Sequence, residues 1–412
     1  MANQLLEYRL TLEHARTGPL ARYVDAFALR LCEQGYATFS IKYRIRLTGA
    51  LSRWMRRRGL GVRDLDEQTT GKFLQCRGRK RRICLGDAPT LRDLLEHFRQ
   101  TGVIPAVAPK TDDTEAGRIE RSFAAYLVHE RGLSDLTVAT YLPVVQRFLD
   151  DCFSTRPLRI EAIAQADISR FVPRHADTLS RGRAKLMVTA LRSFFRFLRM
   201  RGDISTDLAS AVPTVAGWRL ATLPKSIPSE QVEKLLKSCD QSTTTGQRNY
   251  TILLLLARLG LRPAEVVAMT LDDIDWEAGE IRVGGKSHRE DRLPLPRDVG
   301  QALAKYLRHV RPCCSTRRVF VRAKAPLCGF VDSSAVYSLV RRIFDAAQIR
   351  PAQRGPYILR HSLATNMLRR GASLAEIGQI LRHCDLSTTQ IYAKVDLGSL
   401  REIAQPWPGD EE

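Results

Sequence analysis

The 412-residue sequence has no long apolar run. Its apolar stretches stop after about six residues, as in Ile252 to Ala257, far short of the roughly 18 to 20 residues that cross a bilayer. The first residues, MANQLLEYRL, carry Glu7 and Arg9 and lack the apolar core of a signal peptide. We therefore expect a cytoplasmic protein without a transmembrane helix.

Paired cysteines and nucleotide-binding loops are also missing. The nine cysteines are scattered singly, apart from Cys313 and Cys314, and none forms the C-x2-C pair that zinc sites favour. There is no G-x-x-x-x-G-K-[ST] phosphate loop and no clustered carboxylates typical of a two-metal nuclease. We therefore expect reduced thiols and a chemistry that uses no metal, ATP or other cofactor.

Acidic residues are few relative to basic ones. Lys and Arg total 65 against 44 Asp and Glu, which gives a net charge of +21 and a pI near 10.0. Such an excess indicates a polyanionic partner. Hydrophobic residues make up 44% of the chain, which is enough for folded cores, and the length predicts two to four domains.

Two irregular stretches divide the chain. Residues 103–116 combine two prolines with a short acidic cluster, and residues 203–228 contain three prolines, which break helices. The sequence therefore predicts an N-terminal helical module in residues 1–102, a second helical domain in residues 117–202, a linker in residues 203–228 and a third domain in residues 229–412.

The first two blocks resemble each other. At an offset of 98 residues, similar side chains coincide: Tyr43, Leu51 and Phe73 fall on Tyr141, Leu149 and Phe171. Farther on the offset is 100, and LRDLLEHFRQTGVI from Leu91 falls on LRSFFRFLRMRGDI from Leu191. We expect one helical module used twice. Chance similarity between two sets of amphipathic helices is the alternative.

Both blocks contain clusters of basic residues at predicted turns or helix ends. These candidate DNA contacts are Arg53, Arg56, Arg57, Arg58, Arg77, Arg79, Lys80, Arg81, Arg82, Arg181, Arg183 and Lys185. A solvated charged face is the ordinary explanation for such clusters. The net charge of the whole chain favours contacts with phosphates instead.

The third block mixes helical and strand patterns. The segment EIRVGGKSHREDRLPLP, from Glu280, has two short alternating runs around a Gly-Gly-Lys turn, which predicts a β-hairpin or small sheet. Apolar residues at helical spacing precede and follow it. This block is therefore predicted to be α+β, mostly helical with a small antiparallel sheet.

Four segments of the third block hold candidate catalytic residues. They are ARLGLRPAEV around Arg262, VGGKSH with Lys286, YILRHSLATNML with Arg360, and LRHCDLSTTQIYAKV with His383 and Tyr392. Each residue alone has an ordinary structural explanation, but in this order over about 130 residues the segments resemble the tyrosine recombinase (phage-integrase-like) family. The resemblance implies a catalytic domain in residues 229–412 and a SAM-like core-binding domain in residues 117–202. Residues 1–102 are then expected to be a divergent copy of that domain.

The resemblance also implies the active site. Its members would be Arg262, Lys286, Tyr357, Arg360, His383 and the nucleophile Tyr392, with Glu265 and His361 in supporting positions. Two guanidiniums suit a phosphodiester, because each donates two hydrogen bonds to its anionic oxygens. Lysine on a hairpin is suited to protonate the departing 5′ oxygen, and histidine to bind the phosphate or move the tyrosine proton.

One position departs from the family pattern. The family's second motif usually reads His-x-x-Arg-His, whereas here Tyr357 stands in the place of the first histidine. A tyrosine is not a base at neutral pH, but it donates hydrogen bonds. We therefore expect Tyr357 to bind a phosphate oxygen rather than to transfer a proton, and His361 to pack nearby.

The resemblance implies a site-specific DNA recombinase or integrase that works through a 3′-phosphotyrosyl intermediate, and we expect it to belong to a mobile element. Its expected partners are double-stranded DNA with inverted half-sites and further copies of the chain, as a dimer per site and a tetrameric synapse. A short helix in residues 396–412 would dock in a groove of its own or a neighbouring subunit. The alternatives are a type IB topoisomerase and a catalytically idle DNA-binding regulator.

Overall fold

The structure is a computed structural model that describes residues 9–79, 82–106, 114–154, 157–216, 223–284, 290–383 and 385–395. The candidate residues Lys80, Arg81 and Lys286 and the segment 396–412 lie outside the described residues. Two compact units are present, one formed by residues 1–105 with 222–412 and the other by residues 106–221. None of the described helices is both long and apolar enough to cross a membrane.

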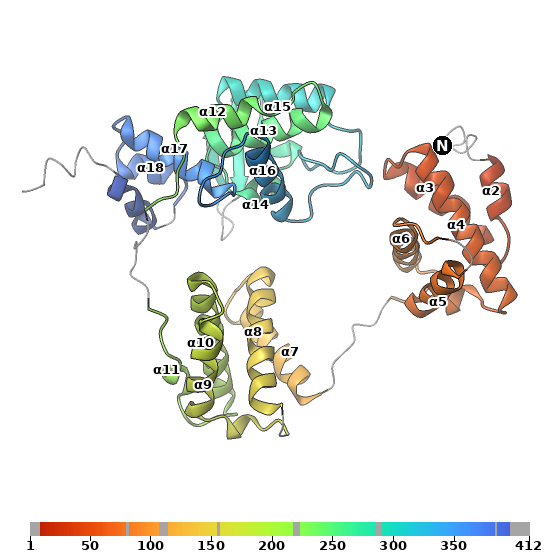
Figure 1. The fold of residues 1–412 in the computed structure, drawn as a ribbon, viewed down its shortest axis with the longest axis horizontal. Coiled ribbons are helices and arrows are strands. Elements are labelled where there is room, and N and C mark those ends of the chain that lie inside the picture. The colour runs from red at the N-terminus through yellow and green to blue at the C-terminus, as the bar shows by residue number, and fades with distance from the viewer. Residues whose placement is uncertain are drawn as a thin grey trace, which may run out of the picture. The chain divides into compact units, whose positions relative to one another are not determined.

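The N-terminal part of the first unit is a bundle of helices (Figure 1). Asp66 caps one of them by accepting a hydrogen bond from the Thr69 amide. Phe27, Leu51 and Leu94 are fully buried in the core of the bundle. The helices are α2 (Arg9–Ala15), α3 (Val24–Glu33), α4 (Thr38–Arg57), α5 (Glu67–Gly78) and α6 (Asp87–Gln100), with 3-10 turns η1 (Ala21–Tyr23) and η2 (Val62–Asp64).

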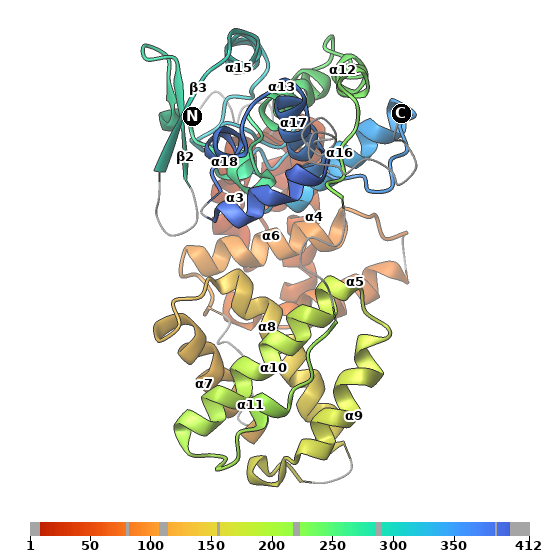
Figure 2. The same cartoon turned by 90° about the vertical axis from the view of Figure 1, so that its left-hand side faces the viewer.

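The second unit is also helical, and α8 and α10 run side by side in it (Figure 2). Its core is aromatic: the Phe148 ring meets Phe171 and Phe195 edge-on, at centroid distances of 5.2 and 5.4 Å. The elements are α7 (Glu115–His129), α8 (Asp135–Phe153), η3 (Ile160–Ala162), α9 (Gln165–Ala176), α10 (Arg181–Arg201) and α11 (Leu208–Ala211). The helix α11 falls within the predicted linker, because Leu208 is buried against the bundle and Asp207 caps the helix.

The C-terminal part of the first unit is built around a central helix, α13, in which Ile252 to Leu256 are all buried. A buried helix of this kind has apolar residues all round rather than on one face. The helices are α12 (Ser229–Lys237), α13 (Thr244–Arg258), α14 (Pro263–Ala268), α15 (Arg297–His309), α16 (Ser334–Ala346), α17 (Tyr357–Arg369) and α18 (Leu374–Ile380), with 3-10 segments η4 (Leu271–Asp273) and η6 (Leu386–Val395).

A small antiparallel sheet accompanies these helices. Its strands lie in the order β1 (Ile274–Asp275), β2 (Glu280–Gly284) and β3 (Glu290–Pro294). Ile281 pairs with Ile274 on one side and Leu293 on the other, and all three side chains are buried. This alternation puts one face of the sheet on the core. The predictions of helical N-terminal modules and of a mostly helical α+β domain with a small antiparallel sheet are confirmed.

Candidate active site

The loop between α13 and α14 places Arg262. Gly260 has a φ of +57°, and a Cβ there would come within 2.9 Å of the Leu381 side chain, so glycine allows both the turn and the close approach. Arg262 precedes Pro263, which suits the first position of a helix. The Glu265 carboxylate accepts a hydrogen bond from the Arg262 amide at 2.7 Å, which caps α14.

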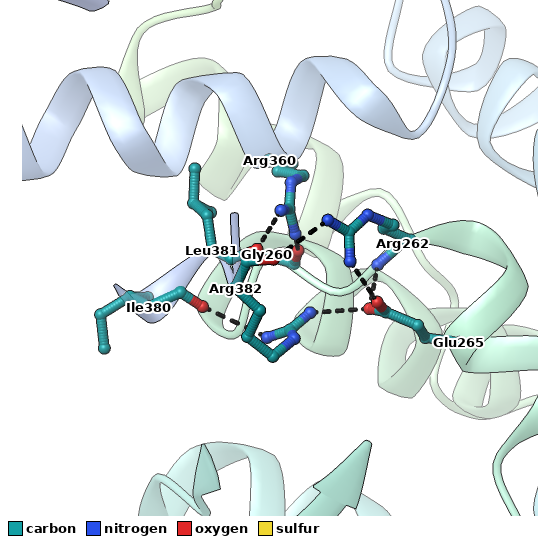
Figure 3. Close-up of polar contacts among 7 residues, drawn as sticks. All are labelled: Gly260, Arg262, Glu265, Arg360, Ile380, Leu381 and Arg382. Atoms are coloured by element: carbon teal, nitrogen blue, oxygen red, sulfur yellow. Dashed lines mark hydrogen bonds and ion pairs between the residues drawn. The ribbon is translucent and has the colours of Figure 1, made fainter. Parts of the chain in front are cut away.

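The second guanidinium comes from α17. Arg360 is only 4% exposed, and it donates to the backbone carbonyls of Gly260 and Leu381 (Figure 3). These two carbonyls belong to the turn before α14 and to the turn after α18. Arg360 therefore joins three segments that lie far apart in the sequence.

A third guanidinium, from Arg382, lies on the other side of Glu265. Arg382 Nη2 lies 2.7 Å from one carboxylate oxygen of Glu265, and Arg262 Nη1 lies 2.7 Å from the other (Figure 3). Arg262 Nη2 also donates to the Arg382 carbonyl at 3.3 Å. Arg382 adopts a φ of +55°, a left-handed conformation that costs an L-residue about 1 kcal/mol. One buried carboxylate thus pairs with two guanidiniums.

The cluster has more positive than negative charge. Burial, followed by the nearby charges of Arg262 and Arg382, lowers the pKa of Arg360 to about 10. Burial also lowers the pKa of Arg382, although Glu265 opposes the shift. Glu265 pairs with two of the three guanidiniums, and Asp291 also acts on Arg382, so positive charge is in excess in the site. Such an excess in a poorly solvated site is suited to bind an anion.

Tyr392 is buried beside α17. Its hydroxyl lies 2.8 Å from His361 Nδ1, and the side chain is 1% exposed. Burial raises the pKa of Tyr392 to about 12, although the charge of Arg360 acts to lower it. The phenol is therefore protonated at neutral pH in this arrangement, and His361 is in position to share its proton.

The two histidines of the site are neutral at pH 7. Burial, followed by the charges of Arg360 and Arg262, lowers the pKa of His383 to about 4. Burial and then Arg360 also lower the pKa of His361. His383 Nδ1 bonds Thr389 Oγ1 at 2.8 Å, three residues before Tyr392. A neutral imidazole offers one donor and one acceptor, so each ring is able to accept a proton during a reaction.

Most of the predicted catalytic residues come together. Arg262, Arg360, His383 and Tyr392 surround the turn after α18, with Glu265 between Arg262 and Arg382. His361, expected to pack nearby, makes a direct hydrogen bond with Tyr392. Lys286 belongs to the connection between β2 and β3, whose residues 285–289 lie outside the described residues.

Tyr357 lies at the edge of this group. It starts α17, is 43% exposed, and its ring lies 6.4 Å from that of Tyr337. Both rings, with His361, line a cavity of about 330 Å³ whose basic lining residues are Lys225 and Arg354. Its expected contact with a phosphate oxygen stays a prediction.

The predicted DNA contacts are mostly at the surface. Two of them serve the fold: Arg53 donates to the His14 carbonyl, and Arg77 pairs with the fully buried Asp87. The exposed ones are Arg56, Arg57, Arg58, Arg79, Arg82, Arg181, Arg183 and Lys185.

Arg382 is the site member that sequence reasoning missed. In the sequence, Arg382 is marked only by its position directly before His383. That position does not distinguish an arginine in an ion pair from an arginine exposed to solvent. Within the part of the chain that is described, no group of three or more His, Cys, Asp or Glu side chains is placed to hold a metal ion.

Comparison with known proteins covers both units. Residues 225–398 match the phage integrase family, and residues 121–202 match the N-terminal SAM-like domain of phage integrases. The chain is 44% identical over 399 residues to a putative integrase/recombinase, y4rA, of Sinorhizobium fredii, and the matched residues cover 96% of each chain. It is 32% identical over 288 residues to tyrosine recombinase XerD of Listeria monocytogenes, which covers 68% of this chain and 95% of the relative.

Solved structures share the fold. The XerH site-specific recombinase bound to a palindromic difH substrate, in a post-cleavage complex, has a TM-score of 0.55 and 21% identity, over 82% of this chain and 95% of that one. A lambda integrase dimer bound to a core site has a TM-score of 0.53 and 17% identity, over 70% of this chain and 98% of that one.

The Glu265 carboxylate should matter more than a surface carboxylate with the same geometry. Glu265→Gln removes the charge between buried guanidiniums, and we expect a loss of about 3 kcal/mol in the free energy of unfolding. Glu233→Gln is the control, because Glu233 also lies 2.7 Å from an arginine, Arg258, but both side chains are well exposed. We expect a loss of under about 1 kcal/mol there. If chemical denaturation gave the same loss of unfolding free energy for both variants, burial of the cluster would make no difference to the strength of its ion pairs.

The backbone of Arg382 gives a separate test. Arg382→Ala and Arg382→Gly both remove the ion pair with Glu265, but glycine also relieves the left-handed conformation. We expect both variants to melt earlier than the wild type, with Gly more stable than Ala by about 1 kcal/mol. Gln348→Gly is the control, because Gln348 has a φ of 56° and is exposed. The account fails if Arg382→Ala is as stable as the wild type.

Proposed function

The chain belongs to the phage integrase family and is a site-specific tyrosine recombinase, and from this premise we propose that it cleaves and rejoins DNA strands through a covalent link to Tyr392. The observation that carries the proposal is the meeting of Arg262, Arg360, His383 and Tyr392 around one turn, with His361 on the Tyr392 hydroxyl. These groups supply an anion site, a nucleophile and a proton acceptor.

The two arginines would bind the scissile phosphate. Arg360 donates to the carbonyls of Gly260 and Leu381, and Arg262 to that of Arg382. Phosphate oxygens are stronger acceptors than carbonyls because they are charged. A phosphodiester entering the site would therefore draw these guanidiniums toward its non-bridging oxygens. The same hydrogen bonds strengthen as charge builds up on those oxygens in the transition state.

The strand is cut by exchange of one phosphodiester for another. The Tyr392 oxygen forms a bond to phosphorus while the bond from phosphorus to the 5′ oxygen breaks, which leaves a 3′-phosphotyrosyl link and a free 5′ hydroxyl. The phenol proton passes to His361, and the 5′ oxygen takes a proton for which we propose Lys286 as the donor. Attack by a 5′ hydroxyl on the phosphotyrosyl link reverses these changes and rejoins the strand.

His383 and Tyr357 have supporting roles in the proposal. His383 carries a neutral ring between the arginine charges and the Tyr392 segment, which suits a hydrogen bond to a phosphate oxygen. Tyr357 opens onto the cavity beside His361, where its hydroxyl would donate to a second oxygen or to a neighbouring phosphate.

The partners and setting follow from the reaction. We propose double-stranded DNA with inverted half-sites as the substrate and an assembly of several copies of this chain, in the cytoplasm, as the active form. A mobile element is the proposed source, since the chain matches the putative integrase/recombinase y4rA over 96% of its length, whereas the match to XerD covers 68%. The difference is about the size of the N-terminal module.

Removal of the Tyr392 hydroxyl should abolish the covalent product. A nicked DNA substrate that loses its 5′ fragment on cleavage traps the phosphotyrosyl adduct, which is visible on a denaturing gel. We expect the adduct from the wild type and none from Tyr392→Phe. Tyr306→Phe is the control, because Tyr306 is also fully buried but lies in the core beside α13. A wild-type yield of adduct from Tyr392→Phe would refute the assignment.

His361 should control the pH dependence of cleavage. Burial, followed by the charge of Arg360, lowers the pKa of His361, so the ring is neutral at neutral and alkaline pH and the wild-type rate should be level between pH 7 and 9. His361→Phe lacks the acceptor, so the phenol proton must go to hydroxide and the rate should rise about tenfold per pH unit. His309→Phe, at the end of α15 and exposed, is the control. Parallel profiles for the wild type and His361→Phe would exclude His361 as the acceptor.

A further inference from the structure

The N-terminal helices repeat the order of the second unit. In each case two helices are followed by a 3-10 turn and two more helices: α3, α4, η2, α5 and α6 correspond to α7, α8, η3, α9 and α10. The turns η2 and η3 begin at residues 62 and 160, and α5 and α9 at residues 67 and 165. Both pairs are 98 residues apart, and α5 and α9 each have 12 residues.

The buried positions of the last helix coincide as well. At an offset of 100 residues each pair is buried, with at most 7% exposure: Leu91 and Leu191, Leu94 and Phe194, Leu95 and Phe195, Phe98 and Leu198, and Ile104 and Ile204. Two segments that have the same order of helices and bury side chains at the same positions pack in the same way. Residues 24–104 therefore repeat the module of the second unit, in which residues 121–202 match the SAM-like domain.

The first copy carries a disproportionate share of the charge. Residues 1–105 contain 20 basic and 10 acidic residues, whereas residues 106–221 contain 17 and 13. A quarter of the chain thus holds an excess of ten of the 21 positive charges.

Part of this charge is gathered at one turn. Arg56, Arg57, Arg58 and Arg63 surround the glycine turn between α4 and η2, and all four are exposed; we call them the arginine turn. In the described part of the chain, none of the four has a carboxylate within 4 Å. The nearest acids in the sequence have other partners, since Asp64 and Asp66 cap backbone amides and Glu67 pairs with Arg99.

The fold does not require these charges. At the offset of 98, Arg56, Arg57 and Arg63 correspond to Ser154, Thr155 and Glu161, whereas Arg58 corresponds to Arg156. The second copy therefore packs the same helices with only one of the four charges. Basic residues at the end of a helix interact favourably with its dipole, but Arg63 lies beyond the helix end. Unpaired like charges repel one another, so their accumulation at one exposed turn indicates a polyanionic ligand.

We propose that the arginine turn binds the phosphate backbone of duplex DNA, which makes the N-terminal module a second DNA-binding module of this recombinase. The proposal rests on the proposed function only in taking DNA as the ligand. Contacts with phosphates add affinity without selecting sequence, and they make binding depend steeply on salt.

The test is the salt dependence of binding to a duplex of about 40 base pairs and random sequence. The full-length triple variant Arg56→Gln, Arg57→Gln and Arg63→Gln leaves Arg58 on the Trp54 ring. For the wild type and the variant, log Kd is measured by fluorescence anisotropy against log salt from about 50 to 300 mM. Each lost phosphate contact lowers the slope by about 0.9, so we expect a decrease of about 2 to 3.

The control removes the same charge from another surface. Arg297→Gln, Lys305→Gln and Arg308→Gln change three exposed residues of α15, and we expect the slope to change by less than about 1. Equal slopes for the wild type and the arginine-turn variant, or equal decreases in both triple variants, would overturn the proposal. Adduct formation on the nicked substrate is scored in parallel, so failure of the cleavage chemistry is distinguishable from failure of this contact.

Discussion

The buried carboxylate of Glu265 is the contact on which the site depends. Guanidiniums from Arg262, Arg360 and Arg382 come from three segments, and without a counter-charge their mutual repulsion would drive the segments apart. Glu265 binds two of them directly, and the carbonyls of the turns hold the third. Removing one partner of a buried ion pair leaves an uncompensated charge, which is far more costly than breaking an exposed pair. The carboxylate therefore fixes the Arg262 and Arg382 guanidiniums relative to each other.

The charge of this cluster fits the demands of phosphoryl transfer. Three guanidiniums lie near the Glu265 carboxylate, and the Asp291 carboxylate also acts on Arg382, so positive charge is in excess. The pentacoordinate transition state of phosphoryl transfer carries about one more negative charge than the phosphodiester. A positive field therefore attracts the transition state more strongly than the ground state, which is the condition for electrostatic catalysis. The burial that raises the pKa of Tyr392 to about 12 keeps the proposed nucleophile protonated until the reaction draws its proton away.

Sequence reasoning predicted the helical modules, the small sheet and the motifs of the site, because these depend on local periodicity and on the order of the motifs. It did not predict the ion pair of Arg382 or the bond from His361 to Tyr392. The first needs a left-handed backbone at a non-glycine residue, and the second needs α17 to lie against η6. Neither property is local in sequence: each results from packing between segments more than 30 residues apart. The short helix α11 was missed for a similar reason, since burial of Leu208 rather than periodicity sustains four helical residues.

The proposed duplication distinguishes the residues that folding requires from those that binding requires. The buried residues of the two modules agree in position across an offset of 100, whereas three of the four arginines of the arginine turn are replaced by Ser154, Thr155 and Glu161 in the second unit. Core substitutions change stability by several kcal/mol, while exposed ones usually change it by less than about 0.5 kcal/mol. A duplicated module is therefore constrained at its core and free at its surface. A concentration of charge that folding leaves free to vary is best explained by something outside the module, and for a DNA recombinase the nearest polyanion is the DNA flanking the site that it cuts.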